Sequence, residues 1–278
     1  MKHEGRRGTV RTITVASGKG GVGKSNTVAN LSIALRKAGK EVLILDADLG
    51  LSNIDVLLDL APKYNIQHVL SGEKSLRDVI IRGPYGIMLL PASSGVQELT
   101  HLNEFQRMKL IEEFDAFGHD IDYLLIDAGA GISPNVAFFC VASQETVVVV
   151  TPEPTSLTDA YALIKVLFTR YQEKDFRVLV NGANHSSDAV EVFRRLSLAA
   201  EKFLSISLDY LGFIPNDVSV RKAVLAQRAC VDLFPSSSAS VHIREIAAKI
   251  IDENGGKVKG SLQLFLGTLL SAERKVPA

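Results

Sequence analysis

One stretch near the start of the chain limits its fold more than any other feature: residues 17–25 read Ser-Gly-Lys-Gly-Gly-Val-Gly-Lys-Ser. An apolar run precedes them, and residues with helical spacing follow. Glycines let successive backbone N–H groups turn inward around a phosphate, and a helix that begins there adds its own unpaired N–H groups and dipole. The pattern therefore predicts a nucleotide phosphate loop between a strand and a helix, rather than a plain glycine turn.

Within this loop the residue types have separate tasks. We expect the Lys24 ammonium to contact the β- and γ-phosphates and the Ser25 hydroxyl to ligate Mg²⁺. The backbone around them would surround the phosphates. The predicted nucleotide-binding residues of the loop are Gly20, Gly21, Val22, Gly23, Lys24, Ser25 and Asn26.

Composition argues against several other classes of protein. Lysine and arginine total 31, as do aspartate and glutamate, so no overall field attracts the chain to nucleic acid, and no direct nucleic-acid contact is expected. The two cysteines, Cys140 and Cys230, form no C-x-x-C pair, which argues for a reducing compartment and against a zinc or iron–sulfur site. The sequence contains no signal-peptide pattern and no long apolar run, so we expect a cytoplasmic protein.

Short β-branched and apolar runs alternate with stretches of helical spacing along the chain. Several runs are apolar at consecutive positions, which indicates strands buried on both faces of a parallel sheet. The alternation predicts an α/β fold with a doubly wound, mostly parallel sheet, helices on both faces and ligands at the carboxyl ends of the strands. The predicted strands are residues 12–16, 41–45, 86–90, 123–126, 146–150, 177–180 and 210–214, with helices from the phosphate loop to Gly39 and over 105–117.

Three acids follow predicted strands. Asp46 and Asp48 stand two residues apart where the second strand stops, so both side chains leave it on the same side. Beside a phosphate loop, one acid can join the metal shell while the other orients the attacking water. Asp127 ends an apolar strand in the manner of a Walker B aspartate, which holds Mg²⁺, usually through water. Ser25 and Asp127 are therefore predicted metal ligands, and the spacing alone leaves open whether Asp46 or Asp48 joins them.

Residues 19–25, Lys-Gly-Gly-Val-Gly-Lys-Ser, resemble the deviant Walker A loop of the MinD/ParA family of ATPases. The resemblance implies a MinD-like P-loop fold, ATP or ADP with Mg²⁺ as cofactors, and a homodimer that forms on ATP binding. It implies that Lys19 reaches the partner's nucleotide in the manner of an arginine finger. It also assigns water activation to Asp48 and a supporting metal role to Asp46, so the catalytic residues would be Lys19, Lys24 and Asp48.

By the same resemblance, the ends of later strands frame the adenine. The Asn181 amide and a loop containing Pro215 and Asp217 are the implied base contacts, and Glu153 is placed at the dimer interface. An Asn-Gly pair after a strand can also be an ordinary turn. Gly182 stands where family members usually carry a larger residue.

Three longer stretches, residues 48–58, 153–165 and 219–224, resemble the flagellar-number regulators of the FlhG/FleN type. This resemblance implies a slow, switch-type ATP hydrolase that regulates flagellar number and assembly. Its implied partners are a flagellar transcription activator, a signal-recognition-type flagellar GTPase or a switch-complex protein. Residues 1–9 lack the Asp-Gln activator helix with which some members stimulate that GTPase, so direct GTPase activation is not expected.

The chain divides, on this interpretation, into an ATPase domain, residues 1–254, and a tail, residues 255–278. Apolar side chains of the tail share one helical face: Leu262, Phe265, Leu266, Leu269 and Leu270. Two interpretations stay open for it. One is an amphipathic helix that brings the protein reversibly to the inner face of the cell membrane, and the other is a helix packed permanently on the core.

Two other functions share this core. A Min-type or ParA-type ATPase would position division sites or partition DNA, although partition requires a stronger basic surface than Arg221, Lys222 and Arg228 provide. A metabolic synthetase or an iron–sulfur protein of the same fold is the third alternative. Excess flagella in cells that lack the protein would select the flagellar regulator, whereas minicells or plasmid loss would select a positioning ATPase.

Overall fold

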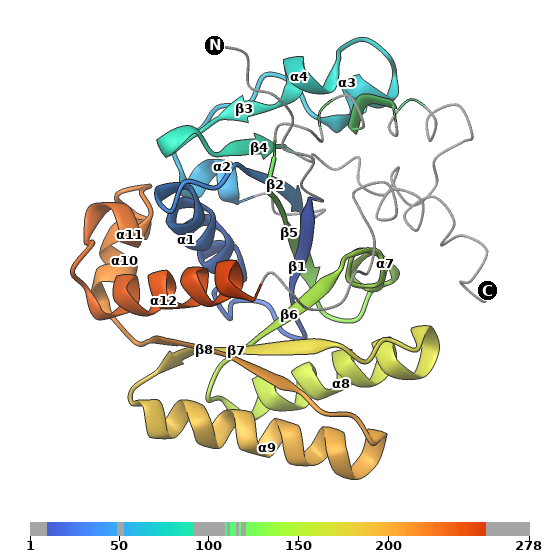
Figure 1. Cartoon of the computed structure of the whole chain (residues 1–278), viewed down its shortest axis with the longest axis vertical. Helices are drawn as coiled ribbons and strands as arrows, with labels where there is room; N and C mark the ends of the chain where they lie inside the picture. Colours follow the sequence, from blue (N-terminus) through green and yellow to red (C-terminus); the bar gives the residue numbers. More distant parts are fainter. Residues whose placement is uncertain are drawn as a thin grey trace.

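A single eight-stranded sheet forms the centre of the molecule (Figure 1). The computed structural model describes residues 10–48, 53–91, 109, 112–114, 117 and 121–253. The strand order is β3-β4-β2-β5-β1-β6-β7-β8, and every neighbouring pair is parallel except β3 with β4. The strands are β1 (Arg11–Ser17), β2 (Val42–Ala47), β3 (Ile81–Arg82), β4 (Met88–Leu90), β5 (Tyr123–Ala130), β6 (Glu145–Val150), β7 (Phe176–Ala183) and β8 (Asp209–Pro215).

Helices cover both faces of this sheet, as Figure 1 shows. On one face the core joins the sheet to α1 (Lys24–Lys37), α2 (Ile54–Leu57), α10 (Val218–Leu225), α11 (Cys230–Leu233) and α12 (Ser238–Asp252). Packed against the other face are α3 (Ile66–Leu70), α4 (Leu76–Val79), α7 (Pro134–Ala142), α8 (Pro154–Tyr171) and α9 (Ser186–Leu204). Because the central strands are buried on both faces, they need consecutive apolar residues, as in β6.

The predicted α/β fold with a doubly wound, mostly parallel sheet is confirmed. All the predicted strands are present. Residues 84–86 form a 3₁₀ turn, so that β4 begins at Met88, and β5 continues past the predicted end at residue 126 to Ala130, which places Asp127 inside the strand. Strand β3 was not predicted, because two residues are too few to show an alternating pattern. Of the predicted helix 105–117, the structure describes residues 109, 112–114 and 117, all of them helical. The tail, residues 255–278, lies outside the described residues.

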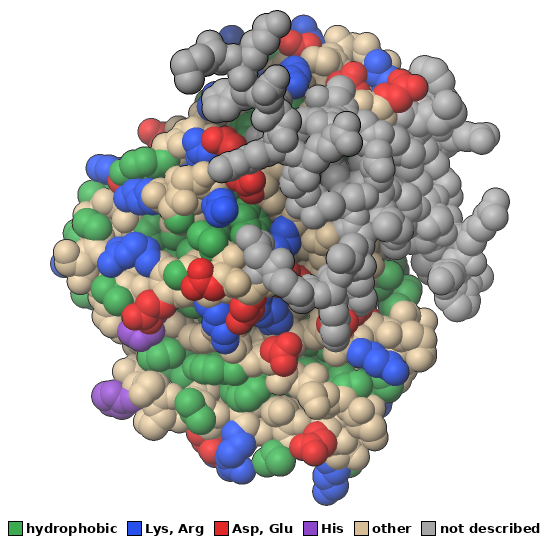
Figure 2. Space-filling model, viewed as in Figure 1, with side chains coloured by type: hydrophobic (Ala, Val, Ile, Leu, Met, Phe, Trp, Pro, Cys, Tyr) green, Lys and Arg blue, Asp and Glu red, His purple; other side chains and the backbone are tan. Residues whose placement is uncertain are grey.

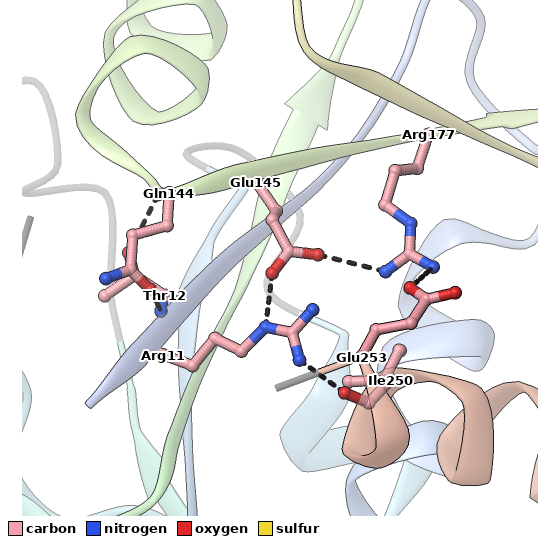
Figure 3. A network of polar contacts seen from close by, with 7 residues as sticks. All are labelled: Arg11, Thr12, Gln144, Glu145, Arg177, Ile250 and Glu253. Carbon is pink, nitrogen blue, oxygen red and sulfur yellow. Dashed lines mark hydrogen bonds and ion pairs between the residues drawn. The ribbon is translucent and has the colours of Figure 1, made fainter. Parts of the chain in front are cut away.

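A network of charged side chains ties the amino-terminal ends of three strands to the end of α12 (Figure 3). Glu145, the first residue of β6, accepts from Arg11 of β1 through one carboxylate oxygen and from Arg177 of β7 through the other, at 3.0 Å. Arg11 also donates to the carbonyl of Ile250, and Arg177 to Glu253. The network therefore fixes α12 at the end of the sheet opposite the phosphate loop.

None of the helices in the described ranges combines the length and the apolar character that crossing a bilayer requires.

Candidate active site

The phosphate loop connects the carboxyl end of β1 to the first residue of α1. Gly23 immediately precedes the helix with a φ of 86°, a left-handed conformation that glycine adopts without steric cost. A Cβ on Gly23 would also lie 2.3 Å from Nδ2 of Asn181, and one on Gly18 would lie 2.1 Å from the backbone of Asp159 in α8. Glycine is therefore required at Gly23 for both its backbone conformation and its close neighbour, and at Gly18 for its close neighbour alone.

Lys24 lies in the first turn of α1 between two of the predicted acids. Its Nζ is 2.8 Å from Oδ1 of Asp127 and 3.8 Å from Oδ2 of Asp48. The lysine and Asp127 are almost fully buried, with side chains 7% and 1% exposed, whereas Asp48 is 27% exposed. The structure thus brings three predicted site residues together, and the partly open one is the residue expected to orient water.

Asp127 carries the clearest sign that the site is made for a cation. Its Oδ2 is buried and has no hydrogen-bond partner in the described part of the chain. Burial raises the pKa of this carboxyl, and the Lys24 ammonium and the Ser25 hydroxyl oppose the shift only in part. An orphaned carboxylate oxygen beside a serine hydroxyl fits the oxygen ligands and bound waters that Mg²⁺ prefers. Ser25 and Asp127 are the residues that would hold the ion, directly or through water, and the predicted metal role of Asp46 stays a prediction.

Asp46 is buried beside Asp127, since the two residues are register partners on neighbouring strands β2 and β5. Its carboxylate accepts from the backbone of Asp48 at 3.2 Å and, through its other oxygen, from Asn53 and Ile54 at 3.3 and 3.4 Å. The last two N–H groups belong to the beginning of α2. Asp46 therefore fixes the backbone on both sides of residues 49–52, which lie outside the described residues.

Lys19 leaves the loop on the side of α8. Its Nζ donates to Oε2 of Glu153 at 2.7 Å and to Oγ1 of Thr155 at 3.0 Å. Both charged side chains are open to solvent, 37% and 63% exposed, so the pair is worth at most about 1 kcal/mol. Lys19 and Glu153, predicted separately, are thus direct partners within one chain.

Two of the predicted base contacts also have structural partners. The Asn181 amide donates to the Val22 carbonyl at 2.7 Å and so joins the end of β7 to the phosphate loop. The Asp217 carboxylate accepts from Ser219 at 2.8 Å and from Ala239 at 3.1 Å, at the beginnings of α10 and α12. Burial raises the pKa of Asp217, but these backbone hydrogen bonds outweigh it and the pKa is lowered. Pro215 ends β8 beside Ala183 of β7, and adenine contacts by Asn181, Pro215 and Asp217 stay predictions.

The family model ParA, described as "NUBPL iron-transfer P-loop NTPase", matches residues 8–251 of this chain. The chain belongs to the ParA/MinD family of P-loop ATPases. It is 45% identical to "Antiactivator FleN" of Pseudomonas aeruginosa over 90% of this chain and 89% of that protein. It is 32% identical to "Flagellum site-determining protein YlxH" of Helicobacter pylori, over 89% of this chain and 84% of that one.

Solved structures of MinD proteins share the ParA/MinD fold found here. MinD of Pyrococcus horikoshii complexed with Mg-ADP superposes with a TM-score of 0.70, at 26% identity, over 90% of this chain and 100% of that one. The MinC:MinD complex of Aquifex aeolicus gives a TM-score of 0.70 at 29% identity, over 91% of this chain and 100% of that chain. The predicted family, the ATPase activity and the cofactors ATP and Mg²⁺ are confirmed by these comparisons and by the family match.

When bound in a ParA/MinD ATPase, the nucleotide would supply the reacting phosphoryl group, and Mg²⁺ would offset its negative charge. The residues of this chain bind and orient. Lys24 lies at the beginning of α1, where backbone N–H groups also attract phosphate. The Asp48 carboxylate is near enough to the Lys24 ammonium to form an ion pair, and it is exposed enough to contact water. The assignment of these individual roles rests on the family resemblance and stays a prediction.

Two residues of this ParA/MinD site were not predicted. Thr155 shares Lys19 with Glu153, and a single threonine in a helix carries no sequence signal of that role. Asn30, fully buried in α1, donates to Asn26 and accepts from the backbone of Val231 at the beginning of α11. A buried amide needs hydrogen-bond partners, but α1 also buries Thr27 and Ser32, so the sequence pattern did not single out Asn30.

Proposed function

We propose that this chain is an ATP-switched regulator of flagellar number that acts as a dimer. The observation that carries the proposal is the 45% identity to an antiactivator, FleN, over nine-tenths of both chains. The similarity to a flagellum site-determining protein supports the same conclusion from a second relative. By analogy with the first name, the partner would be a flagellar transcription activator. A flagellar GTPase of the signal-recognition type or a switch-complex protein is the alternative partner.

In this proposal ATP joins two copies of the chain, and hydrolysis lets them separate. Lys19 would exchange its contacts with Glu153 and Thr155 for the partner's nucleotide. The exchange is easy, since the Lys19–Glu153 pair is solvent-exposed. Asp48 would orient the attacking water, and Asp46 and Asp127 would keep the metal side of the site in place. Slow turnover would make hydrolysis a timer for the dimer.

Substitutions at Asp48 and Lys19 test the proposed switch. Asp48→Ala should bind ATP and dimerise but stop turnover, because only the water-orienting carboxylate is removed. Lys19→Ala should bind ATP without forming the closed dimer, as measured by light scattering with ATP and Mg²⁺. Normal hydrolysis by Asp48→Ala, or a normal ATP dimer of Lys19→Ala, would refute the corresponding role.

Counting flagella tests the biological role. Cells without the protein should carry excess flagella, and expression of Asp48→Ala should reduce the number below normal because the ATP dimer persists. Unchanged flagella together with minicells would instead favour a division-site ATPase, the second candidate. That candidate is supported by 30% identity to "Septum site-determining protein MinD" of Bacillus subtilis over 87% of this chain.

We further propose residues 1–254 as the ATPase domain and residues 255–278 as a tail that brings the protein reversibly to the inner face of the cell membrane. The proposal rests on the apolar helical face of the tail sequence. Two tails in a dimer bind a bilayer far better than one because the second binds at high effective concentration. Vesicle sedimentation with and without ATP tests it, and ATP-independent binding would contradict it.

A further inference from the structure

The surface of α10 is exposed in a way that the nucleotide site does not explain. Ala223 is the only residue of this eight-residue helix that is fully buried. Val218 and Leu225 are 65% and 77% exposed, and Arg221 and Lys222 lie between them on the same helical stripe. Figure 2 shows hydrophobic and basic side chains interleaved over the edge of the molecule that α10 and α11 occupy. We call Val218, Arg221, Lys222 and Leu225, with the neighbouring Val56 of α2, the α10 face.

The cations of the α10 face have no side-chain partner among the described residues. Neither the Arg221 guanidinium nor the Lys222 ammonium makes an ion pair or hydrogen bond within the part of the chain that the structure describes. The second basic helix surface, on α9, is different. There Arg194 and Arg195 both bind Glu191, at 2.8 and 2.7 Å, and lower its pKa to about 2. Exposed Val190 and Leu198 flank those arginines, so α9 offers the same residue types with both cations already bound to one carboxylate.

Hydrogen bonds connect the α10 face to the nucleotide site by two routes. Gln227, just after α10, donates to the Val56 carbonyl of α2 at 2.9 Å, and the beginning of α2 is held by Asp46. Asn30 joins Asn26, in the first turn of α1, to the backbone of Val231 in α11. A shift of Asp46 or of the first turn of α1 would therefore move α2, which carries Val56, and α11, which packs against α10.

We propose that the α10 face binds an acidic amphipathic helix of a partner protein, and that the nucleotide controls this binding through Asp46–α2–Gln227. Two cations without a side-chain partner in the described ranges, set between exposed apolar side chains, fit a helix that carries carboxylates between apolar residues one or two turns apart. The proposal rests on the proposed switch function, and it names the surface through which the switch acts. Arg221 and Lys222 of this face lie within residues 219–224, one of the stretches that resemble the flagellar-number regulators.

A fluorescent helical peptide with leucines at i, i+4 and i+7 and glutamates between them is the probe, used with the full chain. Arg221→Glu/Lys222→Glu and Leu225→Ser should each weaken its binding about tenfold, since each removes about 1.4 kcal/mol of contact energy. The matched controls on α9, Arg194→Glu/Arg195→Glu and Leu198→Ser, should leave it unchanged. Gln227→Ala should still bind the peptide. Its affinity for the peptide should, however, be the same with ADP as with a non-hydrolysable ATP analogue.

The outcomes separate this surface from its alternatives and from the proposed function. Absence of peptide binding up to about 1 mM, or equal loss in the α9 controls, overturns the proposal. So does binding of duplex DNA or anionic vesicles that needs Arg221 and Lys222 but not Leu225, or a change of oligomeric state in Leu225→Ser. In cells, Arg221→Glu/Lys222→Glu should give excess flagella with normal ATP hydrolysis. If deleting the whole gene leaves flagella unchanged, the proposed function fails, while peptide binding still decides the surface.

Discussion

Four glycines of the phosphate loop provide a test of why the loop is glycine-rich. Gly20 has neither a left-handed conformation nor a neighbour within 4 Å of an added Cβ, and Gly21 has only the conformation, with a φ of 78°. Gly23 has both, since its φ is 86° and a Cβ would lie 2.3 Å from Asn181 Nδ2. Gly18 has only a neighbour, the Asp159 backbone at 2.1 Å, about 1 Å short of ordinary contact.

Substitution by alanine should therefore change the free energy of unfolding by amounts that follow a fixed order. Gly20→Ala should be neutral or stabilising by up to about 1 kcal/mol, because it reduces the entropy of the unfolded chain. Gly21→Ala should cost about 1 kcal/mol for its left-handed backbone. Gly23→Ala should cost about 2 kcal/mol, since Asn181 must also release the Val22 carbonyl. Gly18→Ala should cost about 3 kcal/mol, because helix backbone cannot move aside as a side chain can.

Urea denaturation without nucleotide measures these differences free of any effect on ATP binding. A double mutant adds an internal check: with Asn181→Ala already present, Gly23→Ala should cost only about 1 kcal/mol, as Gly21→Ala does. Equal effects at all four positions would refute the reasoning. So would full additivity of Gly23→Ala and Asn181→Ala.

Three further predictions concern groups away from the loop. Glu145→Gln should destabilise the protein by about 2 kcal/mol in urea denaturation, because Arg11 and Arg177 both lose a largely buried carboxylate. Glu191→Gln on α9, where the ion pairs are exposed, is the control. An unchanged denaturation midpoint of Glu145→Gln would contradict this prediction. Burial raises the pKa of Asp232, but hydrogen bonds from Tyr85 and Arg228 outweigh this effect, and the pKa is lowered. The loss of stability in Asp232→Asn, relative to the unsubstituted protein, should therefore be constant above pH 3.8 and shrink as the pH falls through the folded-state pKa. A difference that grows in acid would contradict that sign. Burial raises the pKa of Cys140 to about 12, so in a Cys230→Ala background a thiol reagent should react only as the protein unfolds, and fast reaction of the folded protein would be the contrary result.

The family, the fold and the order of the strands along the chain could be predicted because phosphate-loop chemistry and buried parallel strands leave strong local patterns. The placement of the phosphate loop after β1 and of Asp46 near the carboxyl end of β2 followed from the same patterns. The side-chain contacts of the predicted site residues could not be predicted in this way. Nothing local to Asp217 indicates that its carboxylate joins the beginnings of α10 and α12, because Ala239 is brought there by the fold. Likewise the Lys19–Glu153 contact spans 134 residues of sequence.

The weakness of the Lys19–Glu153 pair has a consequence for the timing of the switch. A lysine held by a deep, buried partner would be released slowly and would make dimer formation wait on local unfolding. Here the holding contact is exposed and shared with one threonine hydroxyl, so thermal motion breaks and remakes it far faster than the nucleotide is hydrolysed. In the proposed cycle, the lifetime of the assembled state is then set by hydrolysis, while its onset follows the cellular supply of ATP without delay.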